Sequence, residues 1–252
     1  MKVLSLIALS ALVGVAGAAA EDTVPTRALS ADLTWSVETR EGDAWRSVQV
    51  RSDDGHSSVS VPISRLDGAS GLEPGAADGP VAFAIRRDAG SARCSGARSG
   101  GAAAGTCRFV SDPAFEQGLA QRRVRLGKRN NLIALALVDA HLTLVDELSR
   151  EGLKIADASD LIAATALKVT GDYVHELKAA GLTLDNLGDA YAARALNLDA
   201  AFLEQMSAAG YPHLTLHQAI TMKAVGVTPE YAEAMNRAAG AAHAVEGMGE
   251  LQ

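Results

Sequence analysis

The sequence predicts an α+β protein in which an N-terminal antiparallel β domain precedes a C-terminal α-solenoid-like array of two-helix repeats of about 29 residues. Three observations support this expectation. From residue 33 to residue 110 the chain reads as short alternating segments separated by turn residues. From Pro113 onward, apolar residues adopt helical spacing, and Ala, Leu, Glu and Lys dominate. Within that second part, Gly152, Gly181 and Gly210 follow one another at intervals of 29 residues.

Residues 1–20 have the organisation of a secretory signal peptide. Lys2 precedes an apolar run from Val3 to Val15, and Ala18 and Ala20 then form an A-x-A cleavage pattern. We therefore expect cleavage before Glu21 and an exported protein, periplasmic or extracellular. The alternative is a membrane anchor, but the apolar run is shorter than a bilayer requires, and small residues follow it.

Charge and hydropathy narrow the range of partners. The chain has 23 basic and 30 acidic residues and a formal net charge of −7, which argues against nucleic acid as the main partner. Beyond the signal peptide, the longest strongly apolar stretch is Leu132 to Val138. Because that stretch is too short to span a bilayer, we expect no integral membrane segment once the signal peptide is removed.

Six strands are expected in the β domain, which we assign to residues 21–111. Two tight turns, at 41–43 and 53–55, separate the first three strands, and the Gly-, Ala- and Pro-rich stretch 67–79 is expected to be a surface loop. The expected strands are Leu33 to Thr39, Arg46 to Arg51, Ser57 to Ile63, Pro80 to Arg87, Ser91 to Gly96 and Ala104 to Val110. The aromatic candidates for the core are Trp35, Trp45, Phe83 and Phe109.

The two cysteines, Cys94 and Cys107, are predicted to form a disulfide. An exported protein meets conditions in which thiols oxidise. A two-residue turn at Gly100-Gly101 would also place residues 94 and 107 opposite each other across a hairpin. The alternative is a pair of free, buried thiols.

Residues 112–137 are expected to connect the two parts and to include helix. Five basic residues lie close together in this segment: Arg122, Arg123, Arg125, Lys128 and Arg129. Such a cluster could meet an acidic partner or an anionic membrane surface. No aromatic residue is interleaved and no apolar face accompanies the charge, so we expect a solvated linker.

The repeats are assigned to residues 138–240, and residues 241–252 to a flexible tail. Apolar residues recur four positions before the first three repeat glycines, as Leu148, Leu177 and Met206, and Gly240 follows Gly210 after 30 residues. Each unit is predicted to hold two helices of about ten residues. Helices this short are unstable alone and must bury their apolar faces against neighbouring units.

Capping residues indicate where these helices begin. The first helix of a unit is expected to start at Thr170, Asp199 or Thr228 and to end at the recurring glycine. The second helix is expected to start near Ser159, Thr183 or Thr215. Thr215 and Gln218 have the spacing of a capping box.

Two sequence segments resemble repeats of a poorly characterised family of exported bacterial proteins. They are GVTPEY at Gly226 to Tyr231 and AGYPHLTL at Ala209 to Leu216. Similar repeats are appended to some membrane metallopeptidases of the beta-lactam-sensor type. The resemblance covers residues 138–240 and extends more loosely to Pro80 to Phe83 and Arg87 to Gly90. It implies the architecture and a setting in the cell envelope, but no reaction.

Because of this metallopeptidase association, zinc is the first chemistry to test. The required pattern has two histidines one helical turn apart with a glutamate between them, and His175-Glu176 is followed by Ala179 where the second histidine should stand. His213 and His217 are four residues apart, but His213 precedes the expected helix start and no third ligand lies near. We therefore expect no metal and no cofactor.

Other catalytic patterns are incomplete as well. The sequence has no Gly-x-Ser-x-Gly motif, and the glycines from Gly100 to Gly105 lack the lysine of a phosphate-binding loop. The acidic turn at 53–55 lacks the spaced ligands of a calcium loop. Oxidation of both cysteines removes a thiol nucleophile. No catalytic residue is therefore predicted.

The leading hypothesis from the sequence is a non-catalytic envelope protein that binds or scaffolds another protein through its helical repeats. An alternative is a regulatory or sensory accessory of an envelope peptidase or signalling system, as the attachment of similar repeats suggests. A second alternative is an enzyme whose active site has no recognisable motif.

Overall fold

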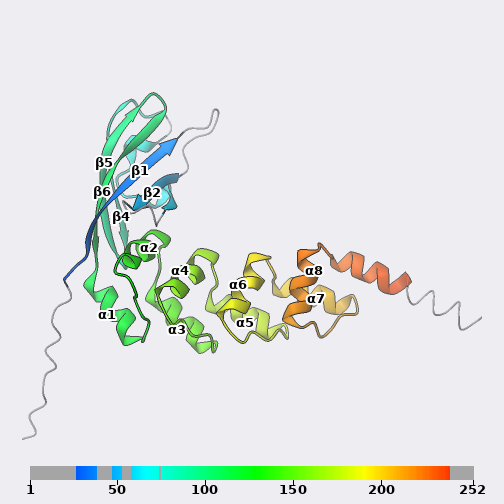
Figure 1. The fold of residues 1–252 in the computed structure, drawn as a ribbon. Helices are drawn as coiled ribbons and strands as arrows, with labels where there is room; N and C mark the ends of the chain where they lie inside the picture. Colours follow the sequence, from blue (N-terminus) through cyan, green and yellow to red (C-terminus); the bar gives the residue numbers. More distant parts are fainter. Residues whose placement is uncertain (1–26, 39–46, 53–57, 74, 239–252) are drawn as a thin grey trace, which may run out of the picture.

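The computed structural model describes residues 27–38, 47–52, 58–73 and 75–238. Several sequence predictions lie outside these residues: the signal peptide 1–20 with its cleavage before Glu21, the core position of Trp45, the turns at 41–43 and 53–55, the last repeat glycine Gly240 and the tail 241–252. In the described part, an antiparallel sheet stands at one end of a series of short helices that run away from it (Figure 1). The α+β class and the N-terminal position of the β part are therefore confirmed.

The sheet has six antiparallel strands in the order β3-β2-β1-β6-β5-β4. All six expected strands are found. Their bounds are β1 Ser30–Glu38, β2 Ser47–Ser52, β3 Ser58–Pro62, β4 Gly79–Arg87, β5 Gly90–Ser99 and β6 Ala102–Ser111. The expected alternation of buried and exposed residues is clearest in β4 to β6, whose inner face covers the core.

The aromatic core of the sheet centres on Trp35. Its ring meets Phe83 edge to face at a centroid distance of 5.1 Å, and its Nε1 donates to the carbonyl of Ser95 at 3.2 Å. Gly96 and Gly105 face each other in β5 and β6 below this ring. A Cβ added at either glycine would come within 2.7 Å of the indole, so only glycine leaves room for Trp35 here.

The hairpin of β5 and β6 carries the predicted disulfide between Cys94 and Cys107. The two residues are direct partners in the strand register, as expected from a two-residue turn at Gly100-Gly101. Both glycines have positive φ, 57° and 86°, which an L side chain rarely adopts. The turn therefore sets the register, and the register brings the thiols together.

The loop between β3 and β4 is more structured than its composition indicates. It contains two short 3-10 helices, η1 at Ile63–Arg65 and η2 at Ser70–Leu72, and Leu72 is fully buried. Asp67 exchanges two backbone hydrogen bonds of 2.8 Å with Ala84 of β4. This loop therefore covers part of the outer edge of β4.

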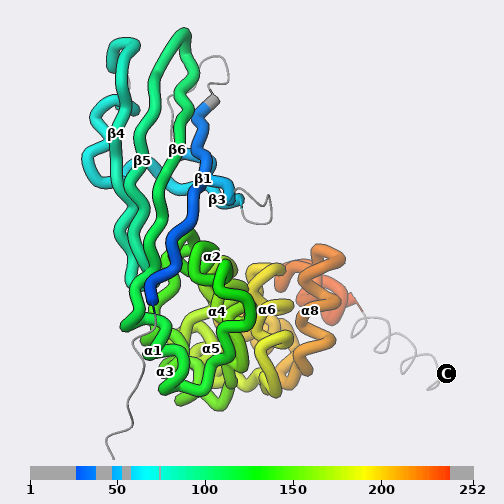
Figure 2. Tube along the Cα trace, turned by 60° about the vertical axis from the view of Figure 1, so that its left-hand side comes forward, coloured from blue at the N-terminus to red at the C-terminus, as the bar shows by residue number. Residues whose placement is uncertain are grey.

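In the part of the chain that the structure describes, eight short helices follow the sheet, and a further helical stretch spans 229–238. They lie in two rows, with α1, α3, α5 and α7 in one and α2, α4, α6 and α8 in the other, and each helix contacts the next in its own row (Figures 1 and 2). Their bounds are α1 Pro113–Gln121, α2 Asn131–Val138, α3 Leu142–Arg150, α4 Ala158–Leu167, α5 Gly171–Ala179, α6 Leu187–Ala195, α7 Ala200–Ala208 and α8 Leu216–Ala224. No helix in the described ranges is long and apolar enough to cross a membrane.

The predicted caps Thr170, Asp199 and Thr228 each accept a hydrogen bond from a backbone N–H three residues later. The capping box of Thr215 and Gln218 is also present. These local predictions are confirmed.

The predicted start near Ser159 is confirmed, since α4 begins at Ala158 and is capped by Asp157. The predicted start near Thr183 was wrong, because Asn186 caps α6 instead. The chain stays extended beyond Thr183 because Leu184 is buried, and the helix begins only where Asn186 accepts from the N–H of Asp189.

The segment expected to be a solvated linker is tied to its surroundings. Arg122 binds Asp146 through two hydrogen bonds of 2.9 and 2.7 Å. The backbone of Arg125 accepts from Ala158 and donates to Ala156. The Arg122 side chain and the Arg125 backbone therefore join this segment to α3 and to the start of α4.

Helix α2 joins the two parts of the fold. It contacts β3, β4, β5 and β6, and so lies against the curled inner face of the sheet. Leu132, Ile133 and Leu135 on this helix are almost fully buried. They belong to one cluster of buried apolar residues that extends from the sheet into the helices. The apolar run from Leu132 to Val138 therefore fills the interface between the sheet and the helices.

Candidate binding site at the sheet–helix junction

The histidines and cysteines considered from the sequence do not form one site. Cys94 and Cys107 are buried in the disulfide. His175 is exposed, and its Nδ1 lies 3.3 Å from Glu151 Oε1. His213 and His217 are exposed as well. Among the described residues, no three His, Cys, Asp or Glu side chains are placed to hold a metal ion.

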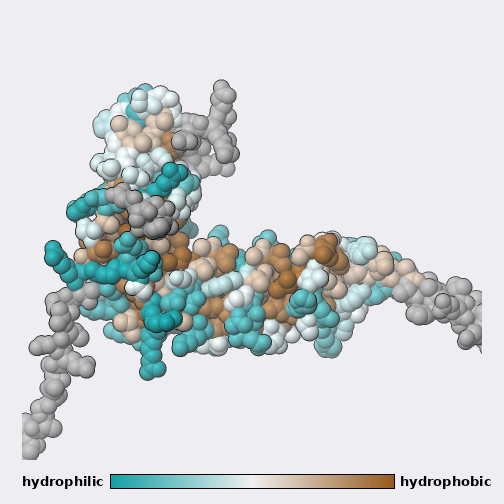
Figure 3. Space-filling view, in the orientation of Figure 1, coloured by the Kyte–Doolittle hydropathy of each residue, from teal (hydrophilic) through white to brown (hydrophobic). Residues whose placement is uncertain are grey.

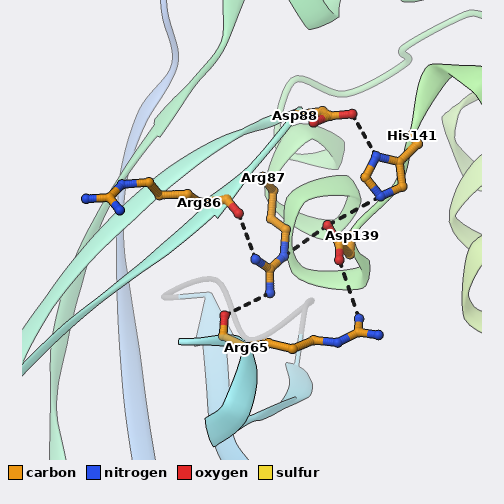
Figure 4. A network of polar contacts seen from close by, with 6 residues as sticks. All are labelled: Arg65, Arg86, Arg87, Asp88, Asp139 and His141. Atoms are coloured by element: carbon orange, nitrogen blue, oxygen red, sulfur yellow. Dashed lines mark hydrogen bonds and ion pairs between the residues drawn. The ribbon is translucent and has the colours of Figure 1, made fainter. Parts of the chain in front are cut away.

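A polar network instead occupies the junction between the sheet and the helices, and Arg87 lies at its centre (Figure 4). Its Nε lies 3.1 Å from Asp139 Oδ1, which makes an ion pair by distance without hydrogen-bond geometry. Its Nη1 donates to the carbonyl of Arg86 at 2.7 Å and its Nη2 to that of Arg65 at 3.2 Å. The Arg87 side chain is only 11% exposed, so its charge depends on these partners.

Asp139 receives contacts from three directions. Arg65 Nη1 approaches its Oδ2 at 3.4 Å, opposite the contact with Arg87. His141 Nε2 lies 3.7 Å from Asp139 Oδ1, while His141 Nδ1 lies 2.7 Å from Asp88 Oδ2. The imidazole therefore lies between two carboxylates, one from the β4–β5 turn and one from the end of α2.

Local sequence explains how these side chains reach one place. Asp139 ends α2 in the left-handed conformation, with φ 66° and ψ 48°, which Asp tolerates better than most residues. This conformation reverses the chain so that His141 precedes α3 directly. Arg87 and Asp88 stand where β4 turns into β5, and Gly90 allows the close return of the hairpin.

A groove of about 580 Å³ opens beside this network. One wall consists of β3 residues, from Val59 to Pro62, and the opposite wall consists of the last residues of α2 and α4. Arg65, Arg87, Asp139, His141 and Lys168 supply its charged and titratable groups. We call this space the junction groove.

The chemistry of the junction groove suits binding. Its partly exposed apolar wall residues, such as Val59 and Val138, can bury apolar side chains, while Arg65 and Lys168 present cationic donors at its rim. Arg65 keeps 59% of its side chain exposed and is therefore accessible to a ligand. His141 lines this groove together with Asp139, and its Nδ1 is held at 2.7 Å from Asp88 Oδ2.

The network was missed at the sequence level. Arg65, Arg87, Asp139 and His141 lie in three separate segments, and no short motif unites them. One regularity in the sequence could have pointed to Asp139. It stands 29 residues before Lys168, which stands 29 residues before Asn197, and this is the interval of the repeat glycines. All three are non-glycine residues with positive φ.

A second ion pair strengthens the first helices. The two hydrogen bonds from Arg122 hold the pKa of the Asp146 carboxyl below its usual value, and the same contact raises the pKa of Arg122. Both side chains are partly solvated. The pair therefore fixes the position of α1 against α3 more than it contributes to stability.

No protein-family model, curated protein or solved structure matches this chain. A functional assignment must therefore rest on the geometry of the junction groove and of the helical rows, since no relative contributes a substrate, a partner or a fold name.

Proposed function

We propose that the protein is a non-catalytic binding or scaffolding protein of the cell envelope, in which tandem two-helix repeats present an extended surface to another protein. The observation that carries this proposal is the regular recurrence of helix boundaries. Helices α3, α5 and α7 begin 29 residues apart, at Leu142, Gly171 and Ala200. Helices α4, α6 and α8 begin with the same interval, at Ala158, Leu187 and Leu216.

Backbone conformation repeats with the same period. Gly152, Gly181 and Gly210 have φ between 77° and 99° and end the helices of one row. Arg123, which stands 29 residues before Gly152, has φ 58° and ends α1 in the same way. We therefore infer that the solenoid-like array begins with α1 and α2, ahead of the start at residue 138 predicted from the sequence.

Contacts between neighbouring units repeat too. Arg194 lies over the ring of Tyr173 at 4.8 Å, and Lys223, 29 residues later, lies over Phe202 at 4.5 Å. Lys178 donates to the carbonyl of Glu151, and Asn236 donates to that of Ala209, each across 27 residues. Units that use the same contacts stack with the same geometry, which produces a long surface for a partner.

The surface itself favours a binding role. Small exposed residues recur at equivalent places on one row, namely Ala166, Ala195 and Ala224. Hydrophobic residues reach the surface at several places along the helices (Figure 3), and Leu167 and Val225 are among the exposed large ones. Low side-chain bulk and accessible apolar area allow close approach of another protein.

An exported location is part of this proposal. The disulfide supports it, because such bonds persist in oxidising compartments. The signal-peptide pattern of residues 1–20 and the resemblance to exported bacterial repeat proteins agree with it.

Site-specific photocrosslinking in the native envelope tests the proposal. A photoreactive residue would replace Ala166, Ala195 or Ala224 on one row, and the exposed His175 or Glu204 on the other. We expect one defined protein adduct, identified by mass spectrometry, from one row and not from the other. Recovery of the free chain from all five positions would contradict a scaffolding role.

A further inference from the structure

Strand β3 has an open edge. It is the last strand of the sheet, and its backbone pairs with β2 alone among the described residues. In an antiparallel pair, alternate residues of an edge strand point N–H and C=O groups away from their partner. The opposite edge of the sheet differs, because Asp67 pairs with Ala84 and covers β4.

The junction groove runs along this open edge. Four consecutive β3 residues, Val59 to Pro62, line it, and four extended residues span roughly 13 Å. The facing wall includes Leu137 and Val138 of α2 and Ala166 of α4. A space with a free strand edge on one side and apolar helix ends on the other fits an extended chain, since a helix would leave the edge groups of β3 unpaired.

Cationic side chains outnumber acidic ones in the lining of the groove. The cations are Arg65, Lys168 and the nearly buried Arg87, whereas Asp139, the only acidic residue of the lining, already contacts both Arg87 and Arg65. Lys168 is exposed and Arg65 keeps 59% of its side chain exposed, so both are accessible cations on a chain whose net charge is −7. Such a site favours a carboxylate over a cationic or neutral group.

We propose that the junction groove binds an extended segment of the partner protein, which adds a strand to β3 and directs an acidic side chain toward the exposed cations Arg65 and Lys168. This inference rests on the proposed protein-binding role and adds both a site and a partner chemistry. The backbone of the segment supplies the strand pairing, its apolar side chains fill the space beside Val59 and Val138, and its carboxylate pairs with a rim cation.

The test begins with a displayed random-peptide library selected against the full-length immobilised protein. Peptides recovered from it are synthesised with a fluorophore, and their binding is measured by anisotropy. We expect acidic sequences with alternating apolar residues. We also expect their binding to slow amide hydrogen exchange at residues 58–61. Absence of enriched peptides, or a consensus without carboxylates, would overturn the proposal.

Two variants with matched controls locate the binding. Ala166→Trp fills the groove from an exposed position, and Ala179→Trp makes the same change at an exposed position of α5, away from the groove. Lys168→Asp reverses a rim charge at a left-handed position, a conformation that Asp139 also adopts. Its control is Asn197→Asp, one unit further on.

Each groove variant should weaken peptide binding by about tenfold or more, and each control by less than about twofold. Equal losses in variant and control, or binding that protects helical amides instead of β3, would refute the groove as the site. Those results would leave the protein-binding role intact, because the crosslinking positions other than Ala166 lie outside the groove lining and test that role separately.

Discussion

Replacing Asp139 by asparagine should destabilise the junction between the sheet and the helices. Asparagine keeps the side-chain shape and tolerates the left-handed backbone, as Asn197 does with φ 51°. The substitution therefore removes the charge and little else. It leaves the Arg87 guanidinium, which is 11% exposed, without its carboxylate.

The expected loss lies between two limits. Removing one partner of a fully buried ion pair costs about 3–5 kcal/mol, whereas exposed pairs contribute about 0–1 kcal/mol. Asp139 is 26% exposed, and Arg87 keeps its two hydrogen bonds to the carbonyls of Arg86 and Arg65. We therefore expect the free energy of unfolding to fall by about 2 kcal/mol.

Urea unfolding followed by circular dichroism measures this loss, with an unchanged dependence on denaturant. In an Arg87→Met background, the same Asp139→Asn change should cost less than about 0.5 kcal/mol, because no buried cation remains. Arg65→Ala, at a mostly exposed side chain, should cost less than about 1 kcal/mol. If Asp139→Asn costs the same with and without Arg87, the ion pair does not hold the junction.

Three further predictions concern the disulfide, the buried tyrosines and the repeat glycines. Replacing Cys94 and Cys107 together by alanine should lower the free energy of unfolding by about 3 kcal/mol in urea, because the bridge spans a sequence separation of 13 and restricts the unfolded chain; equal stability would contradict this. Burial raises the pKa of Tyr173 and that of Tyr191 from 10.0 to about 12, so their stabilisation should be intact below pH 10 and be lost as the pH rises toward 12. Ultraviolet titration should show one fewer late phenolate in Tyr173→Phe and in Tyr191→Phe, and unchanged titration curves would refute the assignment. Gly181→Ala should cost about 1 kcal/mol in thermal unfolding, because alanine disfavours a φ of 90°, and a neutral effect would show that α5 does not need this left-handed end.

The β domain was well predicted because its signals are local. Alternation along each strand, two turn glycines and the symmetric placement of Cys94 and Cys107 act within a single hairpin, so the register followed from a few residues. The caps Thr170 and Asp199 were predicted for the same reason, since a cap interacts only with its own first turn. The start of α6 was misplaced because burial of Leu184, a tertiary effect, keeps the chain extended past Thr183.

The junction groove could not be predicted in this way. The sequence by itself determined the β-then-α order, the disulfide and the spacing of the glycines. These features depend on hydrophobic periodicity, turn residues and cysteine positions, which can be read from residues close together in the chain. Only the tertiary structure decided that α2 lies against the curled sheet and that Arg87 meets Asp139. The contact between Arg87 and Asp139 depends on how the apolar faces of the sheet and α2 pack together. The two charged side chains lie close to each other only once that packing has formed.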